Sequence, residues 1–173
     1  IGARQGHLAQ AVTFAVARGW RDGRCSDVGI ARRADGGQVK TYRIATIPGD
    51  GIGQEVVPAG QQVLEALAQR RGGFGFEFTA FGWGGDWYRR HGVMMPDDGL
   101  DQLRGMDAIL FGSAGDPRIP DHVTLWGLRL KICQGFDQYA NVRPTRILPG
   151  IDAPLKRCGP ADLDWVIVRE NTE

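Results

Sequence analysis

Residues 42–53 read YRIATIPGDGIG, and this stretch decides the fold class. Its first half, Tyr42–Ile47, alternates in polarity and is rich in β-formers, which predicts a strand. Its second half, Pro48–Gly53, holds a proline and three glycines, which only a turn tolerates. Apolar residues then recur at helical spacing over residues 54–70, and Gly72–Gly73 supplies a stop signal. The sequence therefore predicts a strand, a glycine loop and a helix in succession.

Further strands and helices follow in alternation. The predicted strands cover residues 74–81, 108–112, 138–148 and 163–169, and the predicted helices cover residues 86–91, 96–104 and 122–135. Two of these strands contain continuous apolar runs, Ala108–Gly112 and Trp165–Val168, so both are expected to be buried. The alternation predicts an α/β fold in which an open sheet carries helices on its faces.

Composition and charge argue against several classes of protein. The 173 residues include 42% hydrophobic and 24% charged residues with a formal net charge of +1, as in a soluble globular domain. No apolar run approaches the ~20 residues of a membrane span, and no basic patch suggests a nucleic-acid partner. Three widely spaced cysteines, Cys25, Cys133 and Cys158, suit reduced thiols in the cytoplasm. Neither the cysteines nor the histidines show metal-binding spacing, so no metal ligand is expected in this chain.

The first 40 residues differ from the rest in character. They hold seven Lys or Arg and three Asp or Glu, whereas residues 41–173 hold 14 and 17. Residues 18–40 are rich in Arg, Gly and Asp and lack apolar periodicity. We expect residues 1–40 to be a disordered or non-native leader, with a transit peptide as the alternative, and residues 41–173 to form the N-terminal part of an α/β domain.

The glycine loop does not match the standard phosphate-binding motifs. Both the dinucleotide-binding pattern and the P-loop pattern require glycine at position 54, which is Gln54. Two interpretations stay open. The loop is either a tight turn without a ligand or a set of backbone N–H groups that favour an anion at the start of the next helix.

Two arginines follow apolar stretches, Arg143 in NVRP (residues 141–144) and Arg169 in VREN (residues 168–171). If they end strands of an open α/β sheet, they lie where ligands bind. There each could hold a carboxylate bidentately for about 1.5–3 kcal/mol, which suits a small dicarboxylate. The alternative is a pair of surface ion pairs with acids such as Asp137 or Glu170.

Three motifs occur in order: PGDGIG at residues 48–53, NVRP at residues 141–144 and RENTE at residues 169–173. With them the chain resembles the isocitrate/isopropylmalate dehydrogenase family over about residues 41–173. The segments DWY (residues 86–88) and FDQY (residues 136–139) are similar to the branch that oxidises tartrate and D-malate. The resemblance implies an isopropylmalate dehydrogenase-like α/β sheet, incomplete in this chain.

The resemblance also implies an activity. It is the NAD-dependent oxidation of a small 2-hydroxy dicarboxylate, assisted by Mg²⁺ or Mn²⁺ and followed in some members by decarboxylation, in a cytoplasmic homodimer. Carried over by motif, Arg143 and Arg169 would hold substrate carboxylates. Ile52, Gly112 and Gly115 would border the cofactor.

Two departures from the family pattern modify these expectations. The family has an arginine ten residues before the arginine of the Arg-Pro motif, where this chain has Cys133. We expect Arg129, four residues earlier on the same helical face, to replace it. The family's catalytic tyrosine, lysine and metal-binding aspartates lie beyond Glu173, so the chain by itself is expected to be inactive. A 3-isopropylmalate dehydrogenase fragment and a non-catalytic binding or oligomerisation module are the alternatives.

Overall fold

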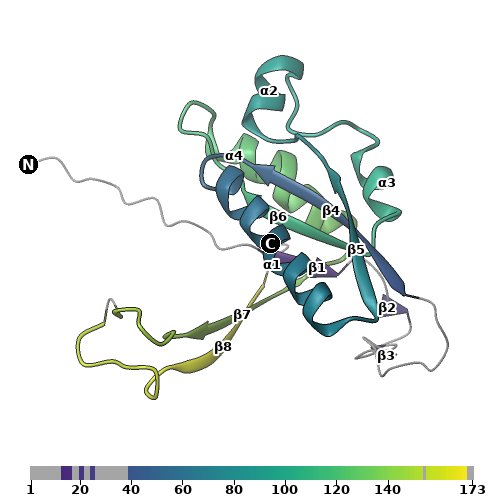
Figure 1. Ribbon diagram of the computed structural model, residues 1–173. Helices are drawn as coiled ribbons and strands as arrows, with labels where there is room; N and C mark the ends of the chain where they lie inside the picture. The colour runs from purple at the N-terminus through teal and green to yellow at the C-terminus, as the bar shows by residue number, and fades with distance from the viewer. Residues whose placement is uncertain (1–12, 17–19, 22–23, 26–38, 154, 171–173) are drawn as a thin grey trace, which may run out of the picture. The chain divides into compact units, whose positions relative to one another are not determined.

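The computed structural model describes residues 13–16, 20–21, 24–25, 39–153 and 155–170, in two compact units, residues 1–132 and 133–173 (Figure 1). The strands are β1 (Thr13–Val16), β2 (Trp20–Arg21), β3 (Arg24–Cys25), β4 (Lys40–Gly49), β5 (Phe74–Ala80), β6 (Ala108–Ser113), β7 (Ala140–Arg146) and β8 (Asp164–Glu170). The helices are α1 (Gly53–Arg71), α2 (Gly85–His91), α3 (Gly99–Arg104), α4 (Asp121–Thr124), η1 (Leu125–Leu130) and α5 (Lys131–Gly135).

The first unit is built on a four-stranded sheet with the order β1-β6-β4-β5. The central strand β4 runs parallel to β5 and to β6, while β1 joins the outer edge of β6 antiparallel. In the register, Ile44 lies between Phe78 of β5 and Ala108 of β6. The parallel core and its helices confirm the predicted α/β fold.

Both faces of β4 and β6 are buried along the centre of the sheet, as the apolar run Ala108–Gly112 predicts for β6. On one face α1 contributes Val57 to a core with Ile44 and Leu110, and the aromatic side chains of β5 pack around it. On the other face Ile47 and Ile109 are also buried. Figure 1 shows α1 in front of the strands and the α4–η1 helix behind them. No helix among the described residues is both long and apolar enough to cross a membrane.

Helix α1 occupies the predicted range almost residue for residue. It begins at Gly53, directly after the glycine loop, and ends at Arg71. Gly72 closes it with a φ of 64°, a left-handed conformation that glycine adopts without steric cost, and its N–H donates to the carbonyl of Ala68. Arg70 and Arg71 place positive charge at the helix C-terminus, where it is favourable.

The single helix predicted over residues 122–135 is divided in the structure. Leu125–Leu130 forms a π-helix between the short helices α4 and α5. In a π-helix the hydrogen bonds run from i to i+5, so each turn holds more than 3.6 residues. The i,i+4 spacing that was expected to align Arg129 with Cys133 therefore does not hold through this segment.

The second unit contains an antiparallel hairpin, β7–β8, in which Val142 pairs with Val168 and Pro144 with Val166. The prediction that Trp165–Val168 is a buried strand is wrong, because every residue of β8 is exposed. An apolar run favours burial but does not identify the surface that covers it. Among the described residues of this unit, none buries β8.

The predicted leader, residues 1–40, lies largely outside the described residues. Of this segment the structure describes β1, β2, β3 and the start of β4. The disorder expected for residues 18–40 falls mainly on residues that the structure does not describe.

Candidate functional site

The carboxyl ends of the three parallel strands meet at one edge of the sheet, and a loop follows each of them. Residues 50–52 follow β4, residues 81–84 follow β5 and residues 114–120 follow β6. In open parallel sheets, ligands bind at this edge. It is therefore the candidate site of the first unit.

A buried carboxylate, Asp50, joins the three loops. Asp50 is 8% exposed. Its Oδ1 accepts a hydrogen bond from the N–H of Gly85 at 2.6 Å, and its Oδ2 accepts one from the N–H of Gly115 at 3.0 Å. The N–H of Asp50 donates to the carbonyl of Ser113 at 2.7 Å. One residue of the glycine loop thus bonds to the segments that follow both neighbouring strands.

A second buried carboxylate, Asp116, lies in the loop after β6 and is paired with two arginines. Arg118 donates to it from its backbone N–H at 2.9 Å and from Nε and Nη2 at 2.9 and 2.8 Å. Arg89 of α2 donates to it from Nη1. The side-chain hydrogen bonds from Arg118 contribute most to holding the pKa of Asp116 far below its ordinary value, while burial opposes them.

This pairing predicts a pH-dependent contribution to stability. A carboxylate whose pKa is lowered by folding stabilises the protein above its unfolded pKa of about 3.9, and the stabilisation is lost as pH falls toward the folded pKa. We expect Asp116→Asn to lower the free energy of unfolding at pH 7. The difference from the unmodified protein should shrink steadily below about pH 4, as measured by urea unfolding at several pH values.

Asp86→Asn is the matched control, because Asp86 pairs with the same Arg89 but its side chain is 78% exposed. An exposed ion pair contributes little, so this variant should unfold nearly as the unmodified protein does at every pH. If Asp116→Asn lowered the free energy of unfolding by the same amount at pH 7 and at pH 3, a stabilising ionised Asp116 would be contradicted.

The three predicted cofactor residues lie at or beside this edge. Ile52 is 44% exposed immediately before α1. Gly115 is exposed at a φ of 151°, with no atom within 4 Å of the position a Cβ would take. Gly112 is buried, and a Cβ there would overlap the carbonyl oxygen of Pro48. The exposed side chain of Ile52 and the open backbone at Gly115 leave room for a flat ring such as that of a nucleotide cofactor. Gly112 instead lets the backbone of β6 pack closely against Pro48 and Gly53. All three assignments stay predictions.

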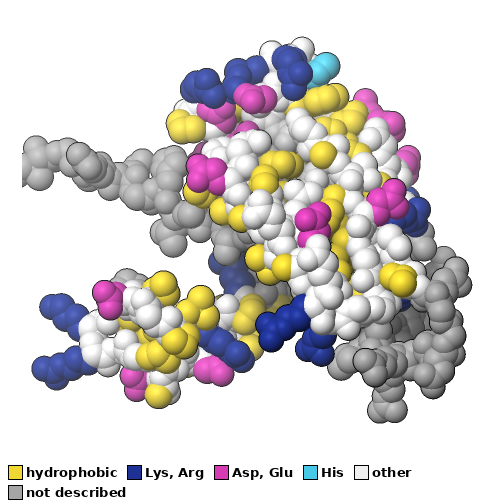
Figure 2. All heavy atoms as spheres, in the orientation of Figure 1, with side chains coloured by type: hydrophobic (Ala, Val, Ile, Leu, Met, Phe, Trp, Pro, Cys, Tyr) yellow, Lys and Arg dark blue, Asp and Glu magenta, His cyan; other side chains and the backbone are white. Residues whose placement is uncertain are grey.

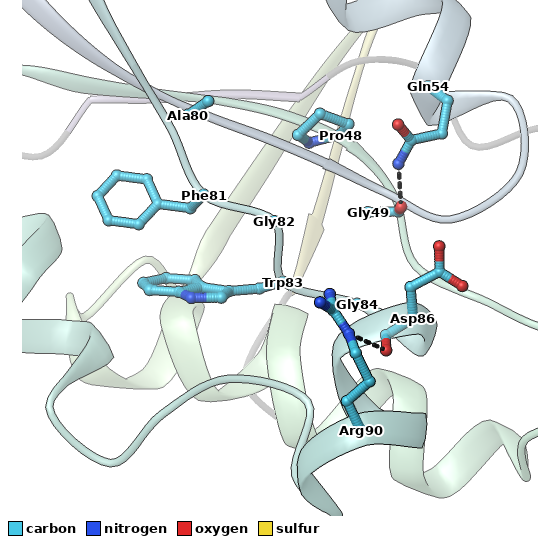
Figure 3. Close-up of a pocket in the computed structure, with 10 residues that line it drawn as sticks. All are labelled: Pro48, Gly49, Gln54, Ala80, Phe81, Gly82, Trp83, Gly84, Asp86 and Arg90. Atoms are coloured by element: carbon cyan, nitrogen blue, oxygen red, sulfur yellow. Dashed lines mark hydrogen bonds between the residues drawn. The ribbon is translucent and has the colours of Figure 1, made fainter.

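A cavity of about 240 Å³ opens beside the glycine loop, between the ends of β4 and β5 and the start of α2 (Figure 3). Phe81 and Trp83 form its aromatic side, with ring centroids 4.6 Å apart. Gln54 donates to the carbonyl of Gly49 at 2.6 Å, and Nε of Arg90 donates to the carbonyl of Asp86 at 3.2 Å. The cavity thus combines apolar rings with one cation, Arg90, and one acid, Asp86, at the same edge of the sheet.

The structure brings the two predicted substrate arginines together on the β7–β8 hairpin. Arg169 is paired directly with Asn141, and Arg143 lies two residues further along β7, so all three side chains share one face. Nε of Arg143 donates to Oδ1 of Asn141 at 3.2 Å. This face holds two guanidinium groups within the reach of one small dianion.

The expected location of these arginines in the open parallel sheet is wrong, although Arg169 does lie near the end of its strand, β8. Arg143 lies in the middle of β7, within an antiparallel hairpin. Pro144 also lies inside β7, within the strand predicted over residues 138–148. Proline is tolerated inside an edge strand, because the missing N–H is then not needed by the ladder.

The third predicted substrate residue, Arg129, lies in η1 of the first unit and is partly buried. Cys133, at the position where the family has an arginine, is 7% exposed at the start of the second unit. A buried neutral thiol offers no charge to a carboxylate, so the role of Arg129 stays a prediction.

Sequence reasoning missed the two buried carboxylates, Asp50 and Asp116. Each is adjacent to glycine in the chain, and an acid next to a glycine at the end of a predicted strand is the signal that could have marked them. Among the described residues, no group of three or more His, Cys, Asp or Glu could hold a metal ion. The residues present therefore do not fit a metal site.

Comparison with known proteins adds independent information. A family described as isocitrate/isopropylmalate dehydrogenase matches residues 43–173. A probable tartrate dehydrogenase/decarboxylase of Agrobacterium vitis is 67% identical over 135 residues, which are 78% of this chain and 38% of that protein. The D-malate dehydrogenase [decarboxylating] of Escherichia coli strain K12 is 52% identical over 137 residues, 78% of this chain and 38% of that protein.

A solved structure agrees with these relatives. The isocitrate dehydrogenase of Methylococcus capsulatus superposes with a TM-score of 0.61 at 30% identity, covering 76% of this chain and 35% of that chain. The present chain thus spans about 38% of the length of the curated relatives it matches.

Proposed function

Since this chain belongs to the isocitrate/isopropylmalate dehydrogenase family, we propose that it is part of a cytoplasmic NAD-dependent oxidoreductase that acts on the hydroxyl of tartrate or D-malate. The names of the two relatives described above support this choice of substrate. The observation that carries the proposal is the shared face of Arg143 and Arg169 on the β7–β8 hairpin. Two cations on one face suit a substrate with two carboxylates.

In this proposal the chain's own residues bind and orient the substrate. The guanidinium groups of Arg143 and Arg169 hold its carboxylates, and the hydrogen bond from Arg143 to Asn141 limits the rotation of that side chain. Ile52 and the backbone at Gly115 hold the nicotinamide cofactor. When bound, NAD accepts a hydride from the hydroxyl carbon. The resemblance also implies Mg²⁺ or Mn²⁺, but we assign no metal ligand among the described residues and no step to a metal.

The test is a substrate assay on the complete gene product. The protein is supplied with NAD, Mg²⁺ or Mn²⁺, and tartrate, D-malate or 3-isopropylmalate in turn, and formation of NADH is followed by absorbance. We expect turnover with tartrate or D-malate. Turnover with 3-isopropylmalate alone would replace this proposal by its nearest alternative, and no turnover with any of the three would overturn it.

Arg129 is proposed as a third substrate ligand that replaces the arginine absent at position 133. Arg129→Ala is expected to lower kcat/KM for the preferred substrate about 10-fold or more, because it removes one charge-assisted contact. Lys131→Ala is the control, since it removes a cation two residues away. Unchanged kcat/KM in Arg129→Ala would exclude Arg129 from the site.

A homodimer is the assembly that we propose for the whole protein. One face of the β7–β8 hairpin carries Val142, Pro144, Val166 and Val168, and the three valines are 60%, 62% and 68% exposed. Figure 2 shows hydrophobic side chains gathered on this hairpin. Burying one such side chain contributes about 1.5–3 kcal/mol, so a second copy of the chain could stabilise this face by covering it.

We expect Val168→Asp to raise the dimer dissociation constant at least about 100-fold. A two-fold interface contains each substitution twice, and the new carboxylate would be buried without a partner. Sedimentation equilibrium of the complete gene product measures the effect. Thr145→Asp, on the opposite face of the hairpin, should leave the dissociation constant nearly unchanged. A monomeric unmodified protein, or equal dissociation constants for the two variants, would reject this interface.

A further inference from the structure

The carboxylate of Asp50 accepts hydrogen bonds from two separate segments of the backbone. Its two oxygens are used separately, Oδ1 by the N–H of Gly85 and Oδ2 by the N–H of Gly115, at 2.6 and 3.0 Å. These two donors lie 30 residues apart in the chain, after different strands of the sheet. A carboxylate can accept at both oxygens at once, whereas an amide has only one acceptor.

Close packing leaves Asp50 little freedom to move. A Cβ built on Gly85 would lie 2.8 Å from Oδ1 of Asp50 and 3.1 Å from Cβ of Asp116, so only glycine lets the backbone approach both acids. Asp50 is buried, and its backbone is bonded to Ser113 on one side and to Gly53 on the other. The position of the carboxylate is therefore fixed by the sheet itself.

Asp116 connects the loop after β6 to helix α2. It accepts hydrogen bonds from Arg89 of α2 and from Arg118, one residue beyond Pro117. The loop after β6 is therefore held at two points. Gly115 is hydrogen-bonded to Asp50 of the glycine loop, and Asp116 is hydrogen-bonded to Arg89 of α2. The exposed Gly115 and the exposed Ile52 lie on the two loops that Asp50 joins.

We propose that Asp50 is a positioning residue for the nicotinamide cofactor, because its carboxylate sets the spacing between the loop that carries Ile52 and the loop that carries Gly115. This inference rests on the proposed function, in which those two residues border the cofactor. Asp50 does not touch the cofactor in this scheme. It acts through the backbone N–H of Gly115, which it holds in place.

The first test measures binding rather than turnover. In the complete gene product, Asp50→Asn keeps the size of the side chain but forces it to release one of the two N–H groups. We expect the dissociation constant for NADH, from its fluorescence, to rise about 10-fold or more. The KM of the dicarboxylate should change less than about twofold, because the substrate arginines lie on a different element.

Asp107→Asn is the matched control. Asp107 also accepts a backbone hydrogen bond, from the N–H of Arg43 at 2.8 Å, but it lies at the start of β6, at the opposite edge of the sheet. An effect that came only from replacing a carboxylate that accepts a main-chain hydrogen bond would appear in both variants. We expect Asp107→Asn to bind NADH as tightly as the unmodified protein, and equal weakening in both variants would overturn the proposal.

The second test does not depend on the cofactor. Hydrogen–deuterium exchange of a peptide that spans residues 113–118 should be at least about 10-fold faster in Asp50→Asn than in Asp107→Asn. If the unmodified protein does not bind NADH, the proposed function fails while the exchange rates still decide whether Asp50 fixes the loop. If NADH binds equally well to Asp50→Asn, the inference fails and the proposed function stands.

Gly115→Ala keeps the inference testable if Asp50→Asn does not fold. The new Cβ would meet no protein atom within 4 Å, but at a φ of 151° an L side chain strains the backbone that Asp50 holds. It should weaken NADH binding by a similar factor, and the double variant should bind no more weakly than the poorer single variant. Full additivity of the two effects, or tight NADH binding by Gly115→Ala, would contradict the scheme.

Discussion

Gly53→Ala is expected to destabilise the protein by about 3 kcal/mol or more. A Cβ at Gly53 would overlap the carbonyl oxygen of Pro48 and would lie 2.8 Å from the backbone nitrogen of Ser113. Both are main-chain atoms at the ends of neighbouring parallel strands, so neither can move aside as a flexible side chain could. Urea unfolding followed by circular dichroism measures the loss.

Gly60→Ala, in the same helix, should have the opposite sign. A Cβ at Gly60 would meet only side-chain atoms of Leu110 at 3.7 and 3.9 Å, which is ordinary contact distance. Alanine within a helix is favoured over glycine by about 0.5–1 kcal/mol. If both alanine variants changed the free energy of unfolding equally, close approach of the backbones at Gly53 would not be the cause.

Arg169→Ala is expected to lower kcat/KM for the preferred dicarboxylate about 10- to 150-fold. The factor corresponds to the loss of one charge-assisted contact of about 1.5–3 kcal/mol. Arg169→Lys should recover only part of the activity, because an ammonium group cannot bind a carboxylate bidentately. Steady-state kinetics of the complete gene product measures both effects.

Arg146→Ala is the control for that experiment. Arg146 belongs to the same hairpin, but it lies on the opposite face and pairs with Asp164, its Nε 2.6 Å from Oδ1. Both members of this pair are exposed, and the change leaves the face that carries Arg169 intact, so kcat/KM should change little. If Arg146→Ala and Arg169→Ala lowered kcat/KM equally, the total positive charge of the hairpin would be the cause, and not a contact between Arg169 and a substrate carboxylate.

The sequence was sufficient to predict the succession β4, α1 and β5 because glycines mark the boundaries of these elements. The loop at residues 48–53 and Gly72–Gly73 enclose α1, and β5 begins directly afterwards at Phe74, as predicted. The glycines predict these boundaries correctly because the turns that they permit depend only on neighbouring residues. The residues on either side therefore hold enough information to set the ends of β4, α1 and β5.

Features that depend on contacts between distant residues could not be predicted. Val166 and Val168 form the same apolar run whether a helix, another sheet or a second chain covers them, so their exposure was missed. The π-helix at Leu125–Leu130 retains an amphipathic sequence and gave no local signal. The arginines of the proposed substrate site were predicted from their motifs, whereas Asp50 was missed because its hydrogen-bond partners lie 35 and 65 residues away.

The position of β4 at the centre of the parallel strands has a consequence for synthesis on the ribosome. Strand β4 is made before either of its parallel neighbours, and β6 is complete only at Ser113. At about 5–20 residues per second, the interval between Gly49 and Ser113 lasts roughly 3–13 s. During this time one edge of β4 is open to other nascent chains. The rate of translation through α1, α2 and α3 therefore controls how long the growing polypeptide is exposed to aggregation.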